Sequence, residues 1–498
     1  MNRRKKLYLN TVTALICQSV SIICGFILPR YILSYFGSDI NGLVTSISRF
    51  LGVISFLELG VGPVIQSNLY KPLADSNTDS ISKIVVSAER FYRRIAYIFI
   101  AYIAVLFFVF PSITAEYNFG FTASLLLIIS ISTFAQYYFG ITYQNFLNAD
   151  QRVYVHSLTQ TITIILNLVV SVLLMKLGYG IHVVKLASSI VFVLRPFVLN
   201  VYVKKHYNIN RKITYTEEPI KQKWNGFAQH LAAVVCGEID VVLLTLFSSY
   251  QNVSIYSVYF LVVSGITNLV MTAASGLESF WGNMLAKGEH SLLAKTYECV
   301  ESLMHAGVTF LFVSTAILIA PFAKVYTTEL EDNAAYYLPL FGAIIAFAYA
   351  AQCLRVPYFR IIKAAGHYKE TQNGAFISMI LNIVVSVVLV FKFQLLGVAI
   401  GTLVAMLYHT IYFAWYLRKN ILNRPFHHFV KHMIVDFAVG MLGFIATSWE
   451  KMNSVTYGAW AVYALIVAVI VGVITLVLNL IVYRKEFSYL IKKILKKA

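Results

Sequence analysis

The 498-residue sequence is 59% hydrophobic and only 12% charged, whereas soluble globular proteins average about half and about a quarter. Its apolar residues gather in long runs, and a helix needs a run of about 20 residues to cross about 30 Å of hydrocarbon. Because a segment inside the membrane must satisfy its own backbone hydrogen bonds, these runs predict helices. Composition therefore excludes a soluble fold and indicates an all-α polytopic membrane protein.

Hydrophobic runs predict about fourteen transmembrane helices. The first run follows a basic stretch from Arg3 to Lys6, and no small-residue cleavage site stands out after it. We therefore interpret it as a retained span and not as a secretory signal. The predicted spans are residues 9–35, 40–69, 92–111, 121–147, 154–175, 182–203, 225–248, 253–284, 300–323, 335–360, 371–391, 394–417, 427–448 and 459–483.

The net charge of +18 is distributed unevenly along the chain. If the N-terminus is cytoplasmic, the cytoplasmic segments and their edges hold 31 of the 40 lysines and arginines, and the external loops hold four. This bias follows the positive-inside rule, and an even number of spans then places both termini in the cytoplasm. The basic charge therefore predicts topology and contact with anionic lipid headgroups, and it does not indicate a nucleic-acid partner.

One apolar segment occurs twice, at an offset of 215 residues. Residues 165–174 in span 5 and 380–389 in span 11 are identical at eight of ten positions, including an Asn and a Ser. An offset of six spans gives both copies the same orientation, as in a two-lobed transporter with a central cleft. The predicted parts are an N-lobe of residues 1–215, a C-lobe of 216–422, and two further spans with a basic tail in 423–498.

Several short motifs accompany this span pattern. They are the stretch from Arg30 to Leu43 across the first external turn, Gly60-Val61-Gly62-Pro63, Phe146-Leu147-Asn148-Ala149-Asp150, and Gly237-Glu238-Ile239-Asp240 in span 7. With them, nearly the whole chain resembles the Wzx-type oligosaccharide flippases of polysaccharide biosynthesis. Their superfamily also holds the MATE exporters and the lipid II flippases. The motifs are loose and specify the family better than the substrate.

The resemblance implies a flippase and not an enzyme. Its substrate would be an isoprenoid (undecaprenyl) diphosphate-linked oligosaccharide repeat unit for capsule, exopolysaccharide or O-antigen synthesis. Alternating access of the lobes would move it from the cytoplasmic to the outer leaflet of the bacterial cytoplasmic membrane. The bilayer and polysaccharide assembly proteins would be its partners.

Two other functions remain open at this stage. A MATE-like multidrug or ion antiporter of the same superfamily would have a smaller cleft with fewer arginines. A membrane polysaccharide polymerase or ligase would need large external loops that carry Arg and His, whereas the longest predicted external loop here is about 323–334.

Four arginines lie inside predicted spans and away from their cytoplasmic edges, where an unpaired charge costs several kcal/mol. Arg49 and Arg195 are too deep to reach the interface easily, so each is predicted to face a cavity or to form a buried ion pair. Arg30 follows Pro29, and snorkelling to the external interface is its alternative. Arg355 lies in the inner half of span 10. We predict that these four contact the diphosphate or the glycan.

The predicted spans also contain acidic residues. A carboxylate in a partly dehydrated cavity can exchange H⁺ or hold Na⁺, and the alternative is a salt bridge to an arginine. Glu238 and Asp240 are two positions apart on a helix and cannot both face one cleft. Asp436 in span 13 is predicted to serve helix packing. The candidates for ion coupling or a buried ion pair are Glu58, Glu238, Asp240 and Glu278.

Catalytic and metal-binding signals are weak. His428 and His432 have i, i+4 spacing, but no HExxH motif accompanies them, and an interfacial basic stretch is the preferred interpretation. There is no P-loop lysine motif, and the five cysteines form neither a CxxC site nor a paired framework. We therefore predict no catalytic residue, no metal and no cofactor other than a coupling H⁺ or Na⁺.

Overall fold

A computed structural model describes residues 3–58, 60–113, 117–220, 227–328, 330, 334–449 and 452–484. Within these residues the regular structure is entirely helical, which confirms the predicted fold class. The chain forms two compact units, Met1–Leu246 and Phe247–Ala498.

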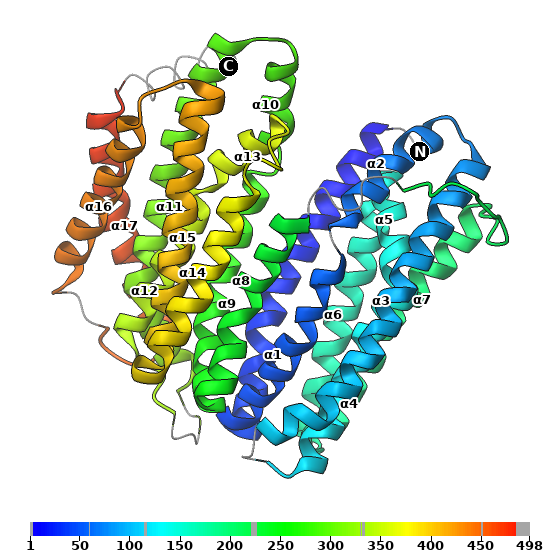
Figure 1. Cartoon of the computed structure of the whole chain (residues 1–498). Coiled ribbons are helices and arrows are strands. Elements are labelled where there is room, and N and C mark those ends of the chain that lie inside the picture. The colour runs from blue at the N-terminus through cyan, green and yellow to red at the C-terminus, as the bar shows by residue number, and fades with distance from the viewer. Residues whose placement is uncertain are drawn as a thin grey trace. The chain divides into compact units, whose positions relative to one another are not determined.

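The first unit contains eight α-helices among the described residues (Figure 1). They are α1 (Arg3–Val53), α2 (Val61–Ala74), α3 (Thr78–Ile113), α4 (Phe119–Ala135), α5 (Ile141–Ala149), α6 (Val153–Lys176), α7 (Ile181–His206) and α8 (Phe227–Phe247), the last of which ends at the boundary.

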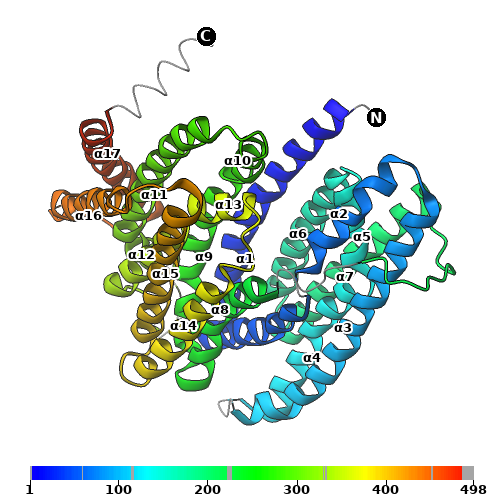
Figure 2. The same cartoon turned by 45° about the horizontal axis from the view of Figure 1, so that its top comes forward.

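The second unit contains nine α-helices in the part of the chain that the structure describes. They are α9 (Tyr250–Ala273), α10 (Leu277–Ala286), α11 (His290–Tyr326), α12 (Pro339–Leu354), α13 (Val356–Ala364), α14 (Gln372–Phe393), α15 (Leu395–Leu417), α16 (His427–Thr447) and α17 (Tyr457–Val482). Figure 2 shows α16 and α17 beside α11. These compact units are not the predicted lobes, whose boundaries at 215 and 422 stay a prediction.

Thirteen helices in the described residues are long and apolar enough to cross a membrane. The first of them, Tyr8–Glu58, is 51 residues long and holds most of predicted spans 1 and 2 in one element. Two helices meet at a sharp bend at Gly37, with φ 79° and ψ 176°, within the predicted turn between spans 1 and 2. Glycine adopts this positive φ without a steric penalty.

The two parts of α1 run in opposite directions. Lys6, near the start of α1, donates a hydrogen bond of 2.9 Å to the carbonyl oxygen of Asp150. Gln66, on α2 beyond the end of α1, donates a hydrogen bond of 3.0 Å to Asn145, which is only five residues before Asp150. The chain has therefore gone out and returned by Gln66, so the second predicted crossing begins in α1 and ends in α2.

The two copies of the repeated segment bury their polar residues in the same way. Asn167 on α6 and Asn382 on α14 are 6% and 0% exposed. The Ser171 hydroxyl donates to Asn167 at 3.3 Å, and the Asn382 amide donates to the Thr402 hydroxyl at 3.3 Å. In each unit the segment packs against the helix that follows it, so the shared Asn and Ser lie in equivalent helix hairpins.

Glycines allow α14 and α15 to pack closely. A Cβ atom at Gly397 would lie 2.5 Å from the carbonyl oxygen of Leu389 and 2.8 Å from the amide nitrogen of Val390. One turn later, a Cβ atom at Gly401 would collide with the Ser386 hydroxyl. Small residues at four-residue spacing are the usual means by which membrane helices bring their backbones together.

We expect Gly397→Ala to lower the free energy of unfolding by about 1–3 kcal/mol, because the backbone of Leu389 cannot move aside as a flexible side chain would. Unfolding of the purified protein in detergent measures this change. Gly265→Ala on α9 is the matched control, since no atom lies within 4 Å of its Cβ position. Equal stability of the two variants would contradict the close packing.

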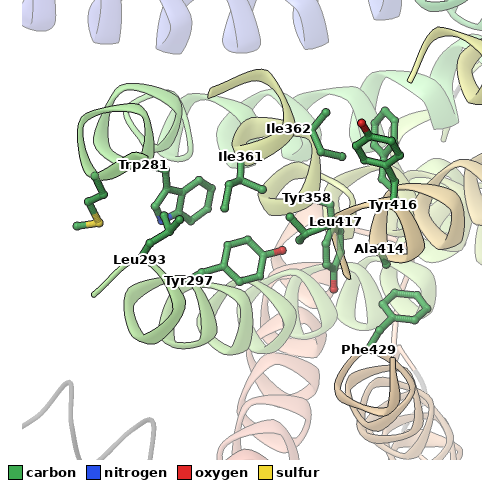
Figure 3. Close-up of a cluster of buried hydrophobic side chains, with 12 residues drawn as sticks. Trp281, Leu293, Tyr297, Tyr358, Ile361, Ile362, Ala414, Tyr416, Leu417 and Phe429 are labelled. Atoms are coloured by element: carbon green, nitrogen blue, oxygen red, sulfur yellow. The ribbon is translucent and has the colours of Figure 1, made fainter. Parts of the chain in front are cut away.

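A cluster of large aromatic side chains forms one core of the second unit. Trp281 of α10, Tyr297 of α11 and Tyr358 of α13 are fully buried and lie against Phe413 of α15 and Phe429 of α16. Figure 3 shows the rings of Trp281, Tyr297 and Tyr358 in one row, with the hydroxyl groups of both tyrosines near the same helices. This core joins α10, α11, α13, α15 and α16.

The basic linker after α7 packs on α3. The amide nitrogen of Asn210 donates to the Ser82 hydroxyl at 3.0 Å, and the guanidinium of Arg90 lies 4.9 Å from the centre of the Tyr215 ring. Ser87 contacts Glu218, and Arg211 lies 3.9 Å from the carboxylate of Glu89. The longest predicted cytoplasmic loop is therefore held on the first unit.

Candidate functional site

A cavity of about 650 Å³ lies inside the first unit. Its volume falls within the range of about 300–1,000 Å³ that is typical of small-molecule sites. Polar and ionisable side chains from several helices line it, among them Glu58, Tyr92, Ser132, Thr133, Gln136, Tyr137, Gln144, Asn145, Arg195 and His230.

Breaks in two helices shape this cavity. After α1 the chain forms a 3₁₀ turn over Ile54–Glu58, and Gly60 adopts φ 68° before α2 begins. Between α4 and α5, residues Gln136–Gly140 form a π-helical turn. Non-helical backbone at membrane depth is tolerated where it lines a cavity, and π-turns often occur at functional sites. Both breaks contribute lining residues.

Arg195 on α7 supplies the positive charge of the cavity. Its Nη2 donates to the Gln144 side-chain oxygen at 3.2 Å and contacts the Nε2 of His156. Because that nitrogen accepts a hydrogen bond from a cation, His156 is neutral in this arrangement. The Nε of Arg195 is buried without an acceptor among the described residues. Because Arg195 lines the cavity, its guanidinium can also receive an acceptor from a ligand there, such as an anionic group.

Glu58 supplies the negative charge. The Tyr137 hydroxyl donates to Glu58 at 2.9 Å, and His230 of α8 contacts the carbonyl oxygen of Ser55, three residues earlier. One cavity thus contains an arginine and a carboxylate that the sequence analysis assigned to substrate binding and to ion coupling, respectively.

A chain of polar groups completes the lining. The Asn145 amide donates to the Tyr92 hydroxyl at 3.2 Å and accepts from Gln66 at 3.0 Å. The Gln136 amide donates to Gln144 at 3.3 Å. Amide and hydroxyl groups of this kind both donate and accept, so they suit the hydroxyl groups of a sugar.

The backbone at Gly140 lies close to Gln136 and to Pro196 of α7. A Cβ atom at Gly140 would lie 2.8 Å from the side-chain oxygen of Gln136 and 3.1 Å from the Cβ of Pro196. Gly140 therefore allows the π-helical turn to lie against α7 next to Arg195.

Arg49 and Glu238 form an ion pair within the first unit. The Nη1 of Arg49 lies 3.2 Å from the carboxylate of Glu238, and the two side chains are 26% and 21% exposed. A Cβ atom at Gly52 would lie 3.1 Å from the same carboxylate, so α8 lies close to α1 here. In this state the structure favours the salt-bridge alternative for both residues.

The other predicted site residues do not line the cavity of the first unit. Arg30 is half-buried on α1, and Asp240 is buried on α8. In the second unit, Arg355 lies where α12 gives way to α13 and donates to the Nδ1 of His409 at 2.5 Å. Glu278 of α10 pairs with Arg360 of α13 at 3.3 Å. Their roles in substrate binding or ion coupling stay predictions.

Sequence reasoning missed most of the neutral lining. The lining residues Tyr92, Gln144, Asn145 and His230 were not selected, because only charged residues inside spans give a strong signal in an apolar sequence. The Gln136-Tyr137-Tyr138 cluster was a usable signal, since two of its residues line the cavity. No group of three metal-ligating side chains is present in the part of the chain described.

Comparison with solved structures identifies the fold. The lipid II flippase MurJ in an inward closed conformation matches with a TM-score of 0.71 at 14% identity, over 95% of this chain and 99% of that chain. The chain has the fold of MurJ and the MATE transporters. No family profile and no curated protein matches the sequence.

Two MATE structures support this assignment. A multidrug resistance MATE family transporter of the MOP superfamily matches in its outward-facing conformation with a TM-score of 0.59 at 13% identity, over 85% of this chain and 98% of that chain. An inward-facing structure with the same description matches with a TM-score of 0.57 at 14% identity, over 82% and 99%. Together with the apolar helices, this fold indicates a multi-pass membrane protein.

We expect the Arg49–Glu238 pair to contribute a measurable coupling energy. Arg49→Gln and Glu238→Gln should each lower stability, and the double variant should lose less than the sum of the two by about 0.5–3 kcal/mol. Denaturant unfolding of the three variants in detergent measures this coupling. Strictly additive losses would show that the two side chains do not interact.

Proposed function

We propose that this protein is a flippase for isoprenoid diphosphate-linked oligosaccharide repeat units. The observation that supports it best is the cavity of the first unit, where Arg195 lies among amide and hydroxyl groups. The shared fold with a lipid II flippase is consistent with a substrate of this class. The protein would reside in a bacterial cytoplasmic membrane with both termini in the cytoplasm, as the charge bias predicts.

The cavity suits the polar end of such a substrate. The guanidinium of Arg195 would take a phosphate oxygen, and Gln136, Gln144 and Asn145 would exchange hydrogen bonds with sugar hydroxyls. A diphosphate crossing bare hydrocarbon would carry its full desolvation cost, and a cationic cavity reduces that cost. The isoprenoid chain needs no such site, because the membrane itself solvates it.

A coupling ion completes the proposal. Of the four acidic candidates for ion coupling, we choose Glu58. It lines the same cavity as Arg195 and accepts a hydrogen bond from the Tyr137 hydroxyl. Uptake of H⁺ or Na⁺ at Glu58 would change the charge of the cavity that receives the anionic substrate. Substrate and ion would thereby influence each other's affinity.

A deletion strain and the Arg195→Gln variant test the substrate. In the deletion strain, lipid-linked repeat units should accumulate on the cytoplasmic side, and the wild-type gene should restore their appearance in the outer leaflet. Loss of a charge-assisted hydrogen bond costs about 1.5–3 kcal/mol, so Arg195→Gln should transport about 10- to 100-fold more slowly. Fractionation by leaflet accessibility measures this rate.

Arg94→Gln is the matched control, since Arg94 is exposed on α3 and does not line the cavity. It should transport as the wild type does. If the deletion strain shows no cytoplasmic accumulation, the oligosaccharide substrate is wrong. If the deletion strain instead loses drug efflux, a MATE-like antiporter is the better assignment.

Glu58→Gln tests the coupling ion. The amide keeps the size of the side chain but neither titrates nor holds a cation strongly, so transport should lose its dependence on pH or on Na⁺. Transport into vesicles, measured across a pH series and with or without Na⁺, gives the result. A variant with the full wild-type dependence on both would exclude Glu58 as the coupling residue.

A further inference from the structure

The second unit contains a buried ionisable cluster that the proposed transport cavity does not use. Glu301 and His305 lie on α11, and His432 and Asp436 lie on α16. Glu301, His305 and His432 are 0%, 1% and 4% exposed. Asp436 was predicted to serve helix packing, and it does join α16 to α11 through His305.

Hydrogen bonds connect the cluster. The Nδ1 of His305 lies 2.6 Å from the Oδ2 of Asp436, and its Nε2 lies 3.0 Å from the Tyr358 hydroxyl. The Thr309 hydroxyl donates to the other oxygen of Asp436 at 2.7 Å. Both nitrogens of His305 and both oxygens of Asp436 therefore have partners.

A second pair lies beside the first. Arg424, in the segment before α16, makes two hydrogen bonds of 2.5 Å to the carboxylate of Glu301. Burial lowers the pKa of the Arg424 guanidinium, but the hydrogen bonds and the charge of Glu301 raise it more, so the net pKa lies above its ordinary value. Arg424 stays charged, and it neutralises Glu301.

Charge balance then leaves one place for a proton. The charges of Glu301 and Arg424 cancel. If His305 is neutral, the ionised Asp436 therefore gives the cluster a net charge of one negative unit. One proton held between the Nδ1 of His305 and the Oδ2 of Asp436 makes the cluster neutral. A buried net charge is expensive, so binding of this proton lowers the electrostatic cost of the cluster.

The cluster has a route to the surface. A pocket of about 120 Å³ at the start of α16 is lined by the exposed His427, by Glu298 and by the buried His432. The His432 ring stacks on that of His305 with centroids 4.5 Å apart, and its Nε2 lies 3.7 Å from Glu301. The Nδ1 of His432 is buried without a hydrogen-bond partner among the described residues. His432 thus lies between the pocket and the pair.

Helix packing alone does not require this chemistry. Farther along the same helices, Val313 of α11 packs against Val439 and Gly443 of α16 with apolar contacts only. Apolar residues of similar volume often replace a buried ion pair at no cost to stability. The ionisable groups therefore indicate a role beyond joining α11 to α16.

We propose that the His305–Asp436 pair is a proton-binding site of the second unit, reached through the pocket at the start of α16. The proton comes from a hydronium ion, whose O–H bond breaks to leave a water molecule, and it forms an N–H or O–H bond within the pair. The ionisable groups that face the pair or its route are Glu298 and Glu301 of α11, Tyr358 of α13, Arg424, His427, His428, Lys431 and His432 in or before α16, and Tyr483 after α17.

Proton uptake by the purified full-length protein in lipid nanodiscs tests this site. On a pH jump from about 9 to about 5, exposed carboxylates stay largely ionised, and the wild type should take up about one proton more per chain than Asp436→Asn. Uptake is followed with a pH indicator in weakly buffered solution. Equal uptake by the wild type and by Asp436→Asn would overturn the proposal.

Two further variants keep the test sound. Glu289→Gln removes an exposed carboxylate just before α11 and should match the wild type. Thr309→Val keeps both ionisable groups but removes a hydrogen bond that favours the charged carboxylate. It should retain the extra proton and raise the midpoint of uptake by about one pH unit.

The midpoint of Thr309→Val tests the site even if Asp436→Asn fails to fold, and an unchanged midpoint would overturn the proposal. Proton uptake needs no substrate. Its result is therefore independent of the transport assay for the proposed function.

Discussion

Hydrocarbon cannot hydrogen-bond, and this constraint governs the whole structure. Every backbone and side-chain polar group inside the membrane must find its partner within the protein, so the chain consists of long helices. Where a helix breaks, as at Ile54–Glu58, at Gly60 and at Gln136–Gly140, the protein must supply other partners or a polar cavity. Both breaks lie at the cavity of the first unit, so the irregular backbone occurs where the candidate functional site is.

The same constraint explains how the buried charges are arranged. Arg49 pairs with Glu238, Arg195 with a neutral histidine and an amide, and Arg424 with Glu301. Among these, only Arg195 lines the large cavity of the first unit. This difference separates a group available to a ligand from groups that hold helices together.

The two units place ionisable groups in different surroundings. In the first unit, Glu58 and Arg195 line a cavity large enough for part of an organic substrate. In the second unit, His305 and Asp436 lie behind a pocket of about 120 Å³, which is too small for an organic substrate. The first arrangement suits transport of a polar headgroup, and the second suits the binding of a proton.

The sequence by itself determined the helical class and the positions of nearly all spans. Apolar runs and basic loops are local features, and each apolar run is by itself long enough to cross the hydrocarbon. It also marked the charged residues inside spans. Only the tertiary structure decided that Arg49 meets Glu238 and that Asp436 meets His305. Which face of a helix meets which neighbour depends on packing between segments far apart in the chain, and no local pattern encodes it.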